Sequence, residues 1–460
     1  MITMTLDQVA AAVGGVVVDG DGSVTSVTSV TIDSRTAGPG SLFVALAGEH
    51  VDGHAYAASA GAAGVLAARP VGVPAVVVPD VTVALGRLAH AVLESLPDVT
   101  VVGITGSSGK TTTKDLLAGL LEPLGSTVAP VGSYNNEIGH PLTVLRADES
   151  TRFLVLEYSA RGSGHIAYLC TIARPDIAVE LNVGVAHLGE FGSREAIAAT
   201  KAELVQALAA DGVAVLNADD ARVAAMAALV GEARVVTYGT GAQVRAEGLH
   251  LEAGRARFTL VTPAGEAVVR LGLFGSHMAS NALAAAAVAL ELGVPVGDIA
   301  ERLSAAVPRS RWRMEVAERA DGVTIVNDAY NANPESVRAA LETLVSLAGG
   351  RRSWAVLGEM AELGAVSADA HAQIGALARQ LGVSRLVAVG KAAAALHTGA
   401  VSVGADHQQS VVAPDLPAAL ALLRAEIAPG DVVLVKGSRS AGLDKLAADL
   451  LADVTAGAAR

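Results

Sequence analysis

The segment GITGSSGKTTTK, residues 103–114, has the residue types of a loop that binds nucleotide phosphates. Glycines let backbone N–H groups close around an anion, a lysine reaches the outer phosphates, and a hydroxyl group coordinates magnesium. The match to GxxxxGK[ST] is imperfect, because Ile104 stands where the first glycine belongs and Gly103 comes one residue early. A glycine-rich turn between a strand and a helix is the alternative. The predicted nucleotide contacts are Gly106, Ser107, Ser108, Gly109, Lys110, Thr111 and Thr112.

Two polar residues follow apolar runs further along the chain. Glu157 ends the run FLVLE, and His187 follows a second run in VGVAHLGEFG. Magnesium prefers oxygen ligands, so a carboxylate that emerges beside a phosphate loop is a predicted metal ligand. A single acid at a strand end is often only a solvated terminus, and a single histidine is often only a surface residue. On the residues alone, His187 remains undecided between a metal or substrate contact and no role.

Lys201 lies in GSREAIAATKAELVQAL, where Gly192 or Ser193 can cap a helix. It is four residues after Ile197 and three before Leu204, so it shares the apolar side of that helix. A lysine at the edge of a core usually extends its ammonium group to solvent. The alternative is a lysine that faces the metal cleft, where burial would lower its pKa and leave a reactive amine.

The elements that must hold these residues alternate between strands and helices. Near-continuous apolar runs such as TVVGITG, RFLVLEYSA and DIAVELNVG are typical of parallel strands buried on both faces. Helices are predicted over 111–121 and, in AYAASAGAAGVLA, over 55–67. The alternation breaks near ESLPDVT and near SAAVPRSRWRMEV, then resumes with GVTIVNDAY, SWAVLGEM, RLVAVG and DVVLVKGS. Ligands of such sheets lie at the C-terminal ends of the strands.

We therefore predict an α/β fold of three domains. A smaller N-terminal α/β domain spans 1–98, a central P-loop domain with a parallel sheet spans 99–307, and a Rossmann-like domain spans 308–460. Apolar residues make up 52% of the 460 residues but aromatic residues only 3%, so Ala, Val and Leu must fill the cores. The length alone suggests about three domains.

Charge and cysteine content exclude several classes of protein. The formal net charge is −13 with no basic run, which argues against a nucleic-acid-binding protein, although a few local cations could hold a small polyanion. Cys170 is the only cysteine, so no intrachain disulfide or thiolate metal cluster is expected. No signal peptide is expected, because the N-terminus lacks a basic segment followed by a long apolar core. No membrane span is expected, because Gly, Asp or Arg interrupts the apolar runs. We expect a cytoplasmic monomer.

Several segments occur together in an order that resembles the Mur ligases, the ATP-dependent enzymes that build the cell-wall peptide. They are TIDSRTAGPGSLFVALAGEHVDGH, GITGSSGKTTTKD, SYNNEIGHPLTVL, HLGEFGSREAIAATKAE, LNADD, RWRMEV, NDAYNANPES, VLGEMAELG and VKGSRS. The most specific are NNEIGHPLT, DAYNANP and VLGEMAELG. They are similar to the family members that join D-alanyl-D-alanine to UDP-N-acetylmuramoyl-tripeptide. The resemblance implies ligation through an acyl phosphate, with ATP and Mg²⁺ as cofactors and a pentapeptide precursor of peptidoglycan as product.

The resemblance also implies a role for particular residues. Lys110 and Thr111 would hold ATP phosphates and magnesium, and Glu157, His187 and a carbamylated Lys201 would hold a second magnesium. Asn281, Arg313 and Asp328 would contact ATP. The implied substrate contacts are Ser34 and Arg35 for the uridine diphosphate, Asn135 and Asn136 for the muramoyl peptide, and Asn331 and Asn333 for the dipeptide. The alternative for NDAYNANPES is an ordinary capped turn.

The chain departs from the family pattern at two places. Tyr158 and Ser159 stand where an E-x-G-A pattern is common, and Met278 replaces the first asparagine of G-x-H-N-x-x-N, while His277 and Asn281 are kept. Two alternatives therefore stay open: another Mur-type ligase that adds a single amino acid, and a nucleotide-binding relative without catalysis. Within the first alternative, the ligase that adds diaminopimelate is disfavoured, because it carries a D-N-P-R motif and the only Asn-Pro here is Asn333-Pro334.

Overall fold

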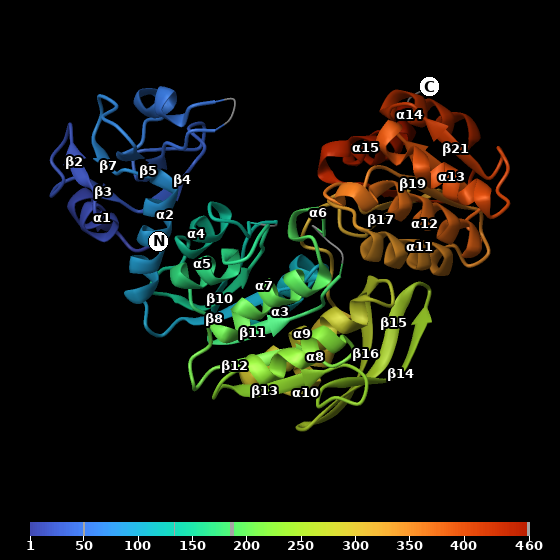
Figure 1. The fold of residues 1–460 in the computed structure, drawn as a ribbon, viewed down its shortest axis with the longest axis horizontal. Helices are drawn as coiled ribbons and strands as arrows, with labels where there is room; N and C mark the ends of the chain where they lie inside the picture. The colour runs from blue at the N-terminus through green and yellow to red at the C-terminus, as the bar shows by residue number, and fades with distance from the viewer. Residues whose placement is uncertain (49–50, 133, 185–187, 458–460) are drawn as a thin grey trace.

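The computed structural model describes residues 1–48, 51–132, 134–184 and 188–457. Three parallel or mostly parallel sheets, each flanked by helices, form the N-terminal, central and C-terminal parts of the chain. Figure 1 shows the N-terminal part in blue at the upper left, the C-terminal part in orange and red at the upper right, and the central part below them. The predicted α/β class with three domains is confirmed.

The N-terminal part is built on a five-stranded sheet of order β2-β7-β6-β5-β4. Its strands are β2 (Val16–Val18), β4 (Ser29–Thr31), β5 (Ser41–Val44), β6 (Gly64–Ala67) and β7 (Ala75–Val77). The short β1 (Met4–Thr5) and β3 (Ser26–Val27) pair apart from it. Helices α1 (Leu6–Val13) and α2 (Val81–Glu94) cover the sheet, and α2 also packs against α4 and α5 of the central part.

The helix predicted over 55–67 is wrong. A short 3₁₀ helix, η1, ends at Ser59 (Gly53–Ser59), and the chain then re-enters the sheet as β6. Gly61 has φ +65°, a left-handed conformation that a helix interior does not contain. The apolar residues Val65 and Leu66 therefore serve as a buried strand.

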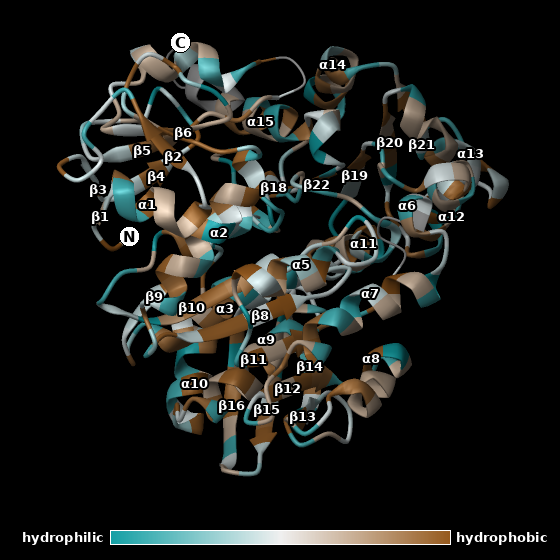
Figure 2. Ribbon diagram, turned by 60° about the vertical axis from the view of Figure 1, so that its left-hand side comes forward, coloured by the Kyte–Doolittle hydropathy of each residue, from teal (hydrophilic) through white to brown (hydrophobic). Residues whose placement is uncertain are grey.

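The central part holds a six-stranded sheet of order β13-β12-β11-β8-β10-β9, parallel throughout. The strands are β8 (Thr100–Thr105), β9 (Ser126–Val128), β10 (Thr151–Glu157), β11 (Ile177–Glu180), β12 (Val213–Asn217) and β13 (Arg234–Tyr238). In Figure 2 these strands are mostly brown, as expected of strands buried on both faces.

Helices cover both faces of the central sheet. The helices are α3 (Lys110–Leu121), α4 (Gly139–Val144), α5 (His165–Ile172), α6 (Leu188–Phe191), α7 (Arg194–Gln206), α8 (Ala221–Ala225), α9 (Met278–Glu291) and α10 (Val296–Ser304), with the 3₁₀ helix η2 (Met226–Leu229). One face packs with α3 and α9, and the opposite face packs with α5 and α7. An antiparallel sheet of β14 (Arg245–Glu252), β15 (Arg255–Thr262) and β16 (Gly265–Phe274) extends the part beyond β13.

The C-terminal part is a second doubly wound sheet, of order β17-β18-β22-β19-β20-β21. Only β17 (Glu315–Glu318) is antiparallel; the others are β18 (Thr324–Asn327), β19 (Ser353–Leu357), β20 (Arg385–Val389), β21 (Ser410–Ala413) and β22 (Val432–Lys436). The helices are α11 (Pro334–Ala348), α12 (Ser367–Gln380), α13 (Ala394–Ser402), α14 (Leu416–Glu426) and α15 (Leu443–Gly457), with η3 (Gly364–Val366), η4 (Lys391–Ala393) and η5 (Arg439–Ala441). Among the described residues, no helix is long and apolar enough to cross a membrane.

Candidate active site

A single cleft between the central and C-terminal parts gathers most of the predicted site residues. It encloses about 1090 Å³, and the C-terminal ends of β8, β10, β18 and β22 open onto it. From the predicted set its lining includes Ser107 to Thr112, Asn135, Asn136, Glu157, Asn281, Arg313, Asp328, Asn331 and Asn333. Gly106 and Lys201 line a small adjoining cavity that shares Ser107 and Lys110 with the cleft.

The phosphate loop joins β8 to α3, and its last glycine cannot be replaced without strain. Gly109 has φ +85°, and a Cβ added there would collide with Oδ1 of Asn281 from α9. Asn281 is buried, so α9 fixes one wall of the loop. The ammonium of Lys110 donates to the carbonyl of Gly106 at 2.5 Å. Burial lowers the pKa of Lys110, the nearby Glu157 opposes this, and Arg313 adds to it.

Glu157 has the environment expected of a cation ligand. It ends β10 in register with Ile104 of β8, which places it next to the phosphate loop. The residue is fully buried, and Nδ2 of Asn135 donates to its Oε2 at 3.3 Å. Among the described residues, its buried Oε1 has no hydrogen-bond partner. A buried oxygen without a partner is costly unless something binds it, and a hard cation fits that oxygen. No cluster of three or more His, Cys, Asp and Glu side chains occurs within the described ranges, and His187 lies outside them.

Lys201 is buried rather than extended toward solvent. Ser193 caps α7 by accepting from the N–H of Ala196, so the predicted N-terminus of this helix is confirmed. Lys201 is only 8% exposed, and it borders the small cavity beside Lys110. Burial lowers the pKa of Lys201, and Lys110 lowers it further, whereas Glu180 acts in the opposite direction. A lysine in this setting holds a larger fraction of free amine than one at the surface.

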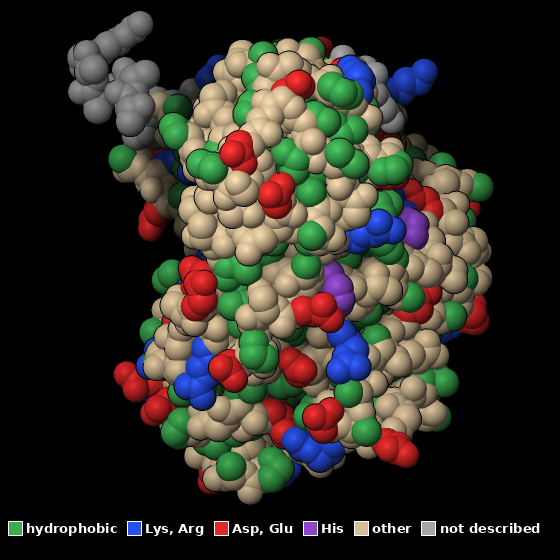
Figure 3. All heavy atoms as spheres, turned by 90° about the vertical axis from the view of Figure 1, so that its left-hand side faces the viewer, with side chains coloured by type: hydrophobic (Ala, Val, Ile, Leu, Met, Phe, Trp, Pro, Cys, Tyr) green, Lys and Arg blue, Asp and Glu red, His purple; other side chains and the backbone are tan. Residues whose placement is uncertain are grey.

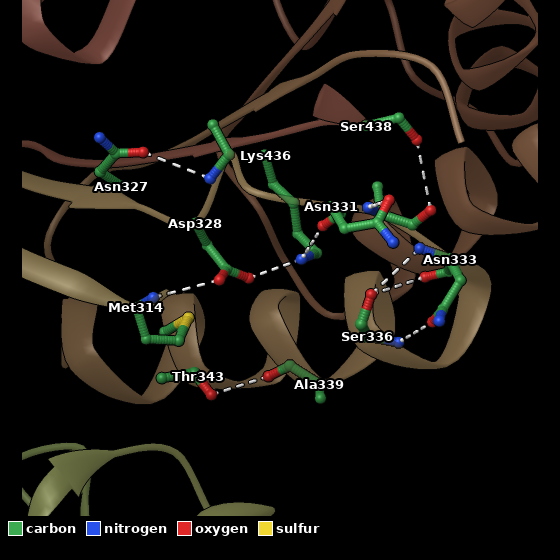
Figure 4. A network of polar contacts seen from close by, with 12 residues as sticks. Met314, Asn327, Asp328, Asn331, Asn333, Ser336, Ala339, Thr343, Lys436 and Ser438 are labelled. Carbon is green, nitrogen blue, oxygen red and sulfur yellow. Dashed lines mark hydrogen bonds and ion pairs between the residues drawn. The ribbon is translucent and has the colours of Figure 1, made fainter. Parts of the chain in front are cut away.

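On the C-terminal side, a buried ion pair organises the loop after β18. Nζ of Lys436 lies 2.6 Å from Oδ2 of Asp328 and donates to the carbonyl of Asn331 at 2.8 Å. The other Asp328 oxygen, Oδ1, accepts from the backbone N–H of Met314 at 3.1 Å. Figure 4 shows that Asp328 lies between the Met314 backbone and the Lys436 side chain. Asp328 therefore fixes the end of the segment that connects the two parts of the chain.

Asn333 caps a helix and also contacts the phosphate loop, while its predicted contact with the dipeptide stays a prediction. Its Oδ1 accepts from the N–H of Ser336 at 2.8 Å and caps α11, as drawn in Figure 4. Its Nδ2 donates to the carbonyl of Ser107 in the phosphate loop at 3.5 Å. The side chain of Asn331 accepts from the N–H of Ala332 at 2.8 Å. The turn is thus an N-cap and also a contact between the C-terminal part and the phosphate loop.

Comparison with known proteins identifies the family. Three family profiles match in order: Mur ligase family, catalytic domain, at residues 26–92; Mur ligase middle domain at 104–289; and Mur ligase, glutamate ligase domain, at 312–439. A UDP-N-acetylmuramoyl-tripeptide–D-alanyl-D-alanine ligase of Mycobacterium bovis is 53% identical, and the match covers 100% of both chains. The chain belongs to the Mur ligase family.

Two solved structures of Mur ligases are similar along nearly the whole chain. A crystal structure of MurF from Acinetobacter baumannii has 33% identity and a TM-score of 0.90, with 98% of this chain and 99% of that chain covered. MurF from Thermotoga maritima in complex with ADP has 30% identity and a TM-score of 0.79, with 92% and 96% covered.

The two departures from the Mur ligase pattern are accommodated in the core. Tyr158 is fully buried and points away from the cleft; its hydroxyl donates to the carbonyl of Ala173 at 2.5 Å, and its ring packs edge-on against His140. Ser159 lines the cleft and Tyr158 does not, so the tyrosine side chain leaves the cleft open. Met278 is also buried, and its Sδ accepts from Nδ2 of Asn281 at 3.8 Å. The thioether thus orients the amide that packs on the phosphate loop.

Some predicted residues are not brought to this cleft. Ser34 and Arg35 follow β4 in the N-terminal part, and Arg35 is exposed and paired with Asp33 at 2.7 Å. Their assignment to a uridine diphosphate stays a prediction. The sequence pattern includes His277 without assigning it a role; it is half-buried and lines the cleft, and its partial burial lowers its pKa to about 4.

The charge of the surface and the charge of the cleft differ. On the face in Figure 3, Lys and Arg side chains lie singly among Asp and Glu. The cleft, in contrast, is lined by several cationic side chains, which are Lys110, Arg161, Arg194, Arg313, Lys436 and Arg439. The guanidinium of Arg313 also lies over the ring of Tyr330, 4.3 Å from its centroid. Acidic side chains line the cleft as well, namely Glu137, Glu157, Asp220, Asp328, Glu335 and Glu362. The described lining is therefore balanced in charge, whereas the whole chain has a net charge of −13, and cations from both parts of the chain are available to a polyanionic nucleotide.

Proposed function

We propose that this Mur ligase joins D-alanyl-D-alanine to UDP-N-acetylmuramoyl-tripeptide and converts ATP to ADP and phosphate. The observation that supports this most strongly is the cleft, which combines the phosphate loop, the buried Glu157 carboxylate and cations from the C-terminal part. The full-length similarity to UDP-N-acetylmuramoyl-tripeptide–D-alanyl-D-alanine ligases supports this substrate pair.

The chemistry follows from what the cleft residues can do. The substrate carboxylate is a poor electrophile, so the γ-phosphoryl group is transferred to it and an acyl phosphate forms. The amine of the dipeptide then attacks, an amide bond forms and phosphate leaves. Lys110 and Arg313 reduce the repulsion between the two reacting anions, which is most of what such a transfer needs. Enclosure between two domains keeps water from hydrolysing the acyl phosphate.

Magnesium would be held by Thr111 at the phosphate loop and, at a second position, by Glu157, His187 and Lys201. When bound, it supplies positive charge beside the phosphates and the substrate carboxylate. Lys201 fits this role only after modification. Its free amine forms an N–C bond to CO₂ and releases one proton, and the resulting carbamate is an anionic oxygen ligand.

The resemblance to Mur ligases is the source of the proposed substrate contacts, and the positions of the cleft residues support them. Asn135 donates to Glu157 and lines the cleft with Asn136, so this pair is well placed for the muramoyl peptide. Asn331 and Asn333 border the cleft from the C-terminal part, which would bring the dipeptide to the acyl phosphate. Ser34 and Arg35 of the N-terminal part, within residues 1–98, would hold the distant uridine diphosphate. The cytoplasmic location and monomeric state stay predictions.

The deciding experiment measures phosphate release from ATP by the purified protein with each substrate added and omitted. Release should require both the tripeptide nucleotide and D-alanyl-D-alanine, and mass spectrometry should show the pentapeptide product. Turnover only with a single amino acid would reassign the substrate and keep the mechanism. ATP binding without turnover on any Mur substrate pair would instead support a non-catalytic relative.

A further inference from the structure

Glu180 is a fully buried carboxyl group to which the proposed mechanism gives no role. It ends β11, and neither of its oxygens has a hydrogen-bond partner within the described part of the chain. Thr105, its register partner on β8, also has a buried hydroxyl that no described residue hydrogen-bonds. A buried acid without partners lowers stability, so its presence requires an explanation other than packing.

The backbone shows what Glu180 faces. Side chains of a strand alternate between the two faces of the sheet. Ile177 and Val179 belong to the core on the α3 and α9 side, whereas Ala178 packs in the core that contains Ile197 and Leu204 of α7. Glu180 is two residues after Ala178, so its side chain lies on the same face of the sheet and faces α7.

Lys201 faces Glu180 from the helix. It lies one turn from both Ile197 and Leu204, which pack against this side of the sheet. Among charged groups, Lys201 acts most strongly on the Glu180 carboxyl, and Asp220 follows it. Asp220 is already engaged, because its oxygens accept from the backbone N–H groups of Val183, Arg222 and Val223. Glu180 is therefore placed to accept a hydrogen bond from Nζ of Lys201.

We propose that Glu180 is a positioning residue that accepts the Nζ–H of Lys201 and so directs the far end of that side chain toward the cation site. The role rests on the proposed function, in which Lys201 carries a carbamate. A carbamate keeps one N–H and has two oxygens. When Glu180 accepts the carbamate N–H between the sheet and α7, both carbamate oxygens remain available to bind a cation on the side of Lys110 and the phosphate loop. Partners of metal ligands commonly contribute 10- to 100-fold to metal affinity or activity.

Two substitutions separate the hydrogen bond from the packing. Glu180→Gln keeps an oxygen acceptor at the same place, and Glu180→Leu fills the site without one. Glu180→Leu should lower kcat about 10- to 100-fold with little change in KM for the dipeptide, and Glu180→Gln should stay within about threefold of the wild type. Thr105→Val, which removes the neighbouring unpartnered oxygen, is the matched control and should leave kcat nearly unchanged. Circular dichroism and thermal melting establish that each variant is folded.

A double-mutant cycle with Lys201→Ala tests whether the effect passes through the lysine. In the Lys201→Ala background, Glu180→Leu should cause less than about a twofold further loss. An equal loss in both backgrounds, or an equal loss in Thr105→Val, would mean that Glu180 acts through general packing, and the proposal would be wrong.

Carbamate formation gives a readout other than activity. ¹³C NMR of protein equilibrated with ¹³C-bicarbonate should show a carbamate signal that Lys201→Ala lacks. In Glu180→Leu, half-maximal signal should require at least fivefold more dissolved CO₂. A wild-type protein without the signal would contradict the proposed role of Lys201 itself. A wild-type signal that Glu180→Leu retains at the same CO₂ concentration would overturn the role of Glu180 alone.

Discussion

Replacing Lys436 by methionine should destabilise the C-terminal part of the chain far more than a surface substitution would. The Lys436 side chain is 3% exposed and that of Asp328 is 14% exposed, so the ion pair is largely removed from water. Methionine fills similar space but loses both the pair with Asp328 and the bond to the Asn331 carbonyl. Removing one partner of a buried pair typically costs about 3–5 kcal/mol, because the other charge remains buried alone.

The assay is urea unfolding followed by tryptophan fluorescence. The chain has two tryptophans, Trp312 in the connecting segment and the fully buried Trp354 on β19, so the signal reports on this part of the molecule. A loss of about 3 kcal/mol also predicts a melting temperature lower by roughly 6–12 °C. Because the protein has several domains, the fluorescence transition must be analysed as that of the C-terminal part and not of the whole chain.

The control is the double variant Asp328→Asn, Lys436→Met. Asparagine is neutral and can still accept from the Met314 N–H, so the double variant should regain at least half of the lost stability. The reasoning would be refuted if Lys436→Met had the same midpoint of urea unfolding as the wild type. A double variant no more stable than Lys436→Met would show that the lost energy does not come from an unpaired Asp328.

Three further predictions concern the central part. Gly109→Ala should weaken Mg-ADP binding at least tenfold by calorimetry, since the new Cβ collides with Asn281; Gly231→Ala, also at positive φ but in open space, should bind normally. Tyr158→Phe should lower stability by about 1 kcal/mol and leave kcat and KM unchanged; altered kinetics would contradict the orientation of this ring away from the cleft. Burial lowers the pKa of His140 from 6.5 to about 4. As the pH falls, the unfolded chain therefore binds a proton at this histidine before the folded protein does. The free energy of unfolding should decrease by about 3 kcal/mol between pH 6.5 and pH 4. The same decline in His140→Asn would contradict this cause.

The strands of the two large sheets could be predicted because burial on both faces leaves a direct mark in the sequence. The runs that contain β8, β10, β11 and β22 are almost uninterrupted apolar segments, and each ends in or beside a polar residue of the cleft. The same reasoning failed at residues 55–67, where small apolar residues suit a helix and a short buried strand equally well. Gly61, which has a left-handed backbone conformation, ends the 3₁₀ segment there, and the following residues form a strand.

The pairings within the site could not be predicted in the same way. Lys436 and Asp328 are 108 residues apart and meet only because β22 lies beside β18 in the sheet, although three strands separate them in sequence. Glu180 lies at the end of an apolar run in the sequence. That its carboxyl group has no hydrogen-bond partner among the described residues depends on which face of β11 it occupies and on which α7 side chains lie there. Hydrophobic periodicity predicts which face of a helix or strand is buried and where the element ends. It does not predict the order of the strands in a sheet, which depends on the whole chain.

The segment that links the two parts of the cleft shows why both are needed. Trp312 and Met314 have φ of +59° and +50°, conformations that cost about 1–3 kcal/mol for each residue with a side chain. Two contacts offset this cost: Asp328 accepts from the Met314 N–H, and the guanidinium of Arg439 stacks over the Trp312 ring, 4.0 Å from its centroid. The residue between them is Arg313, whose side chain lines the cleft. The C-terminal part thus holds the strained linker that carries Arg313. In the proposed reaction, this arrangement would bring the cation to the phosphates only when both parts enclose the nucleotide.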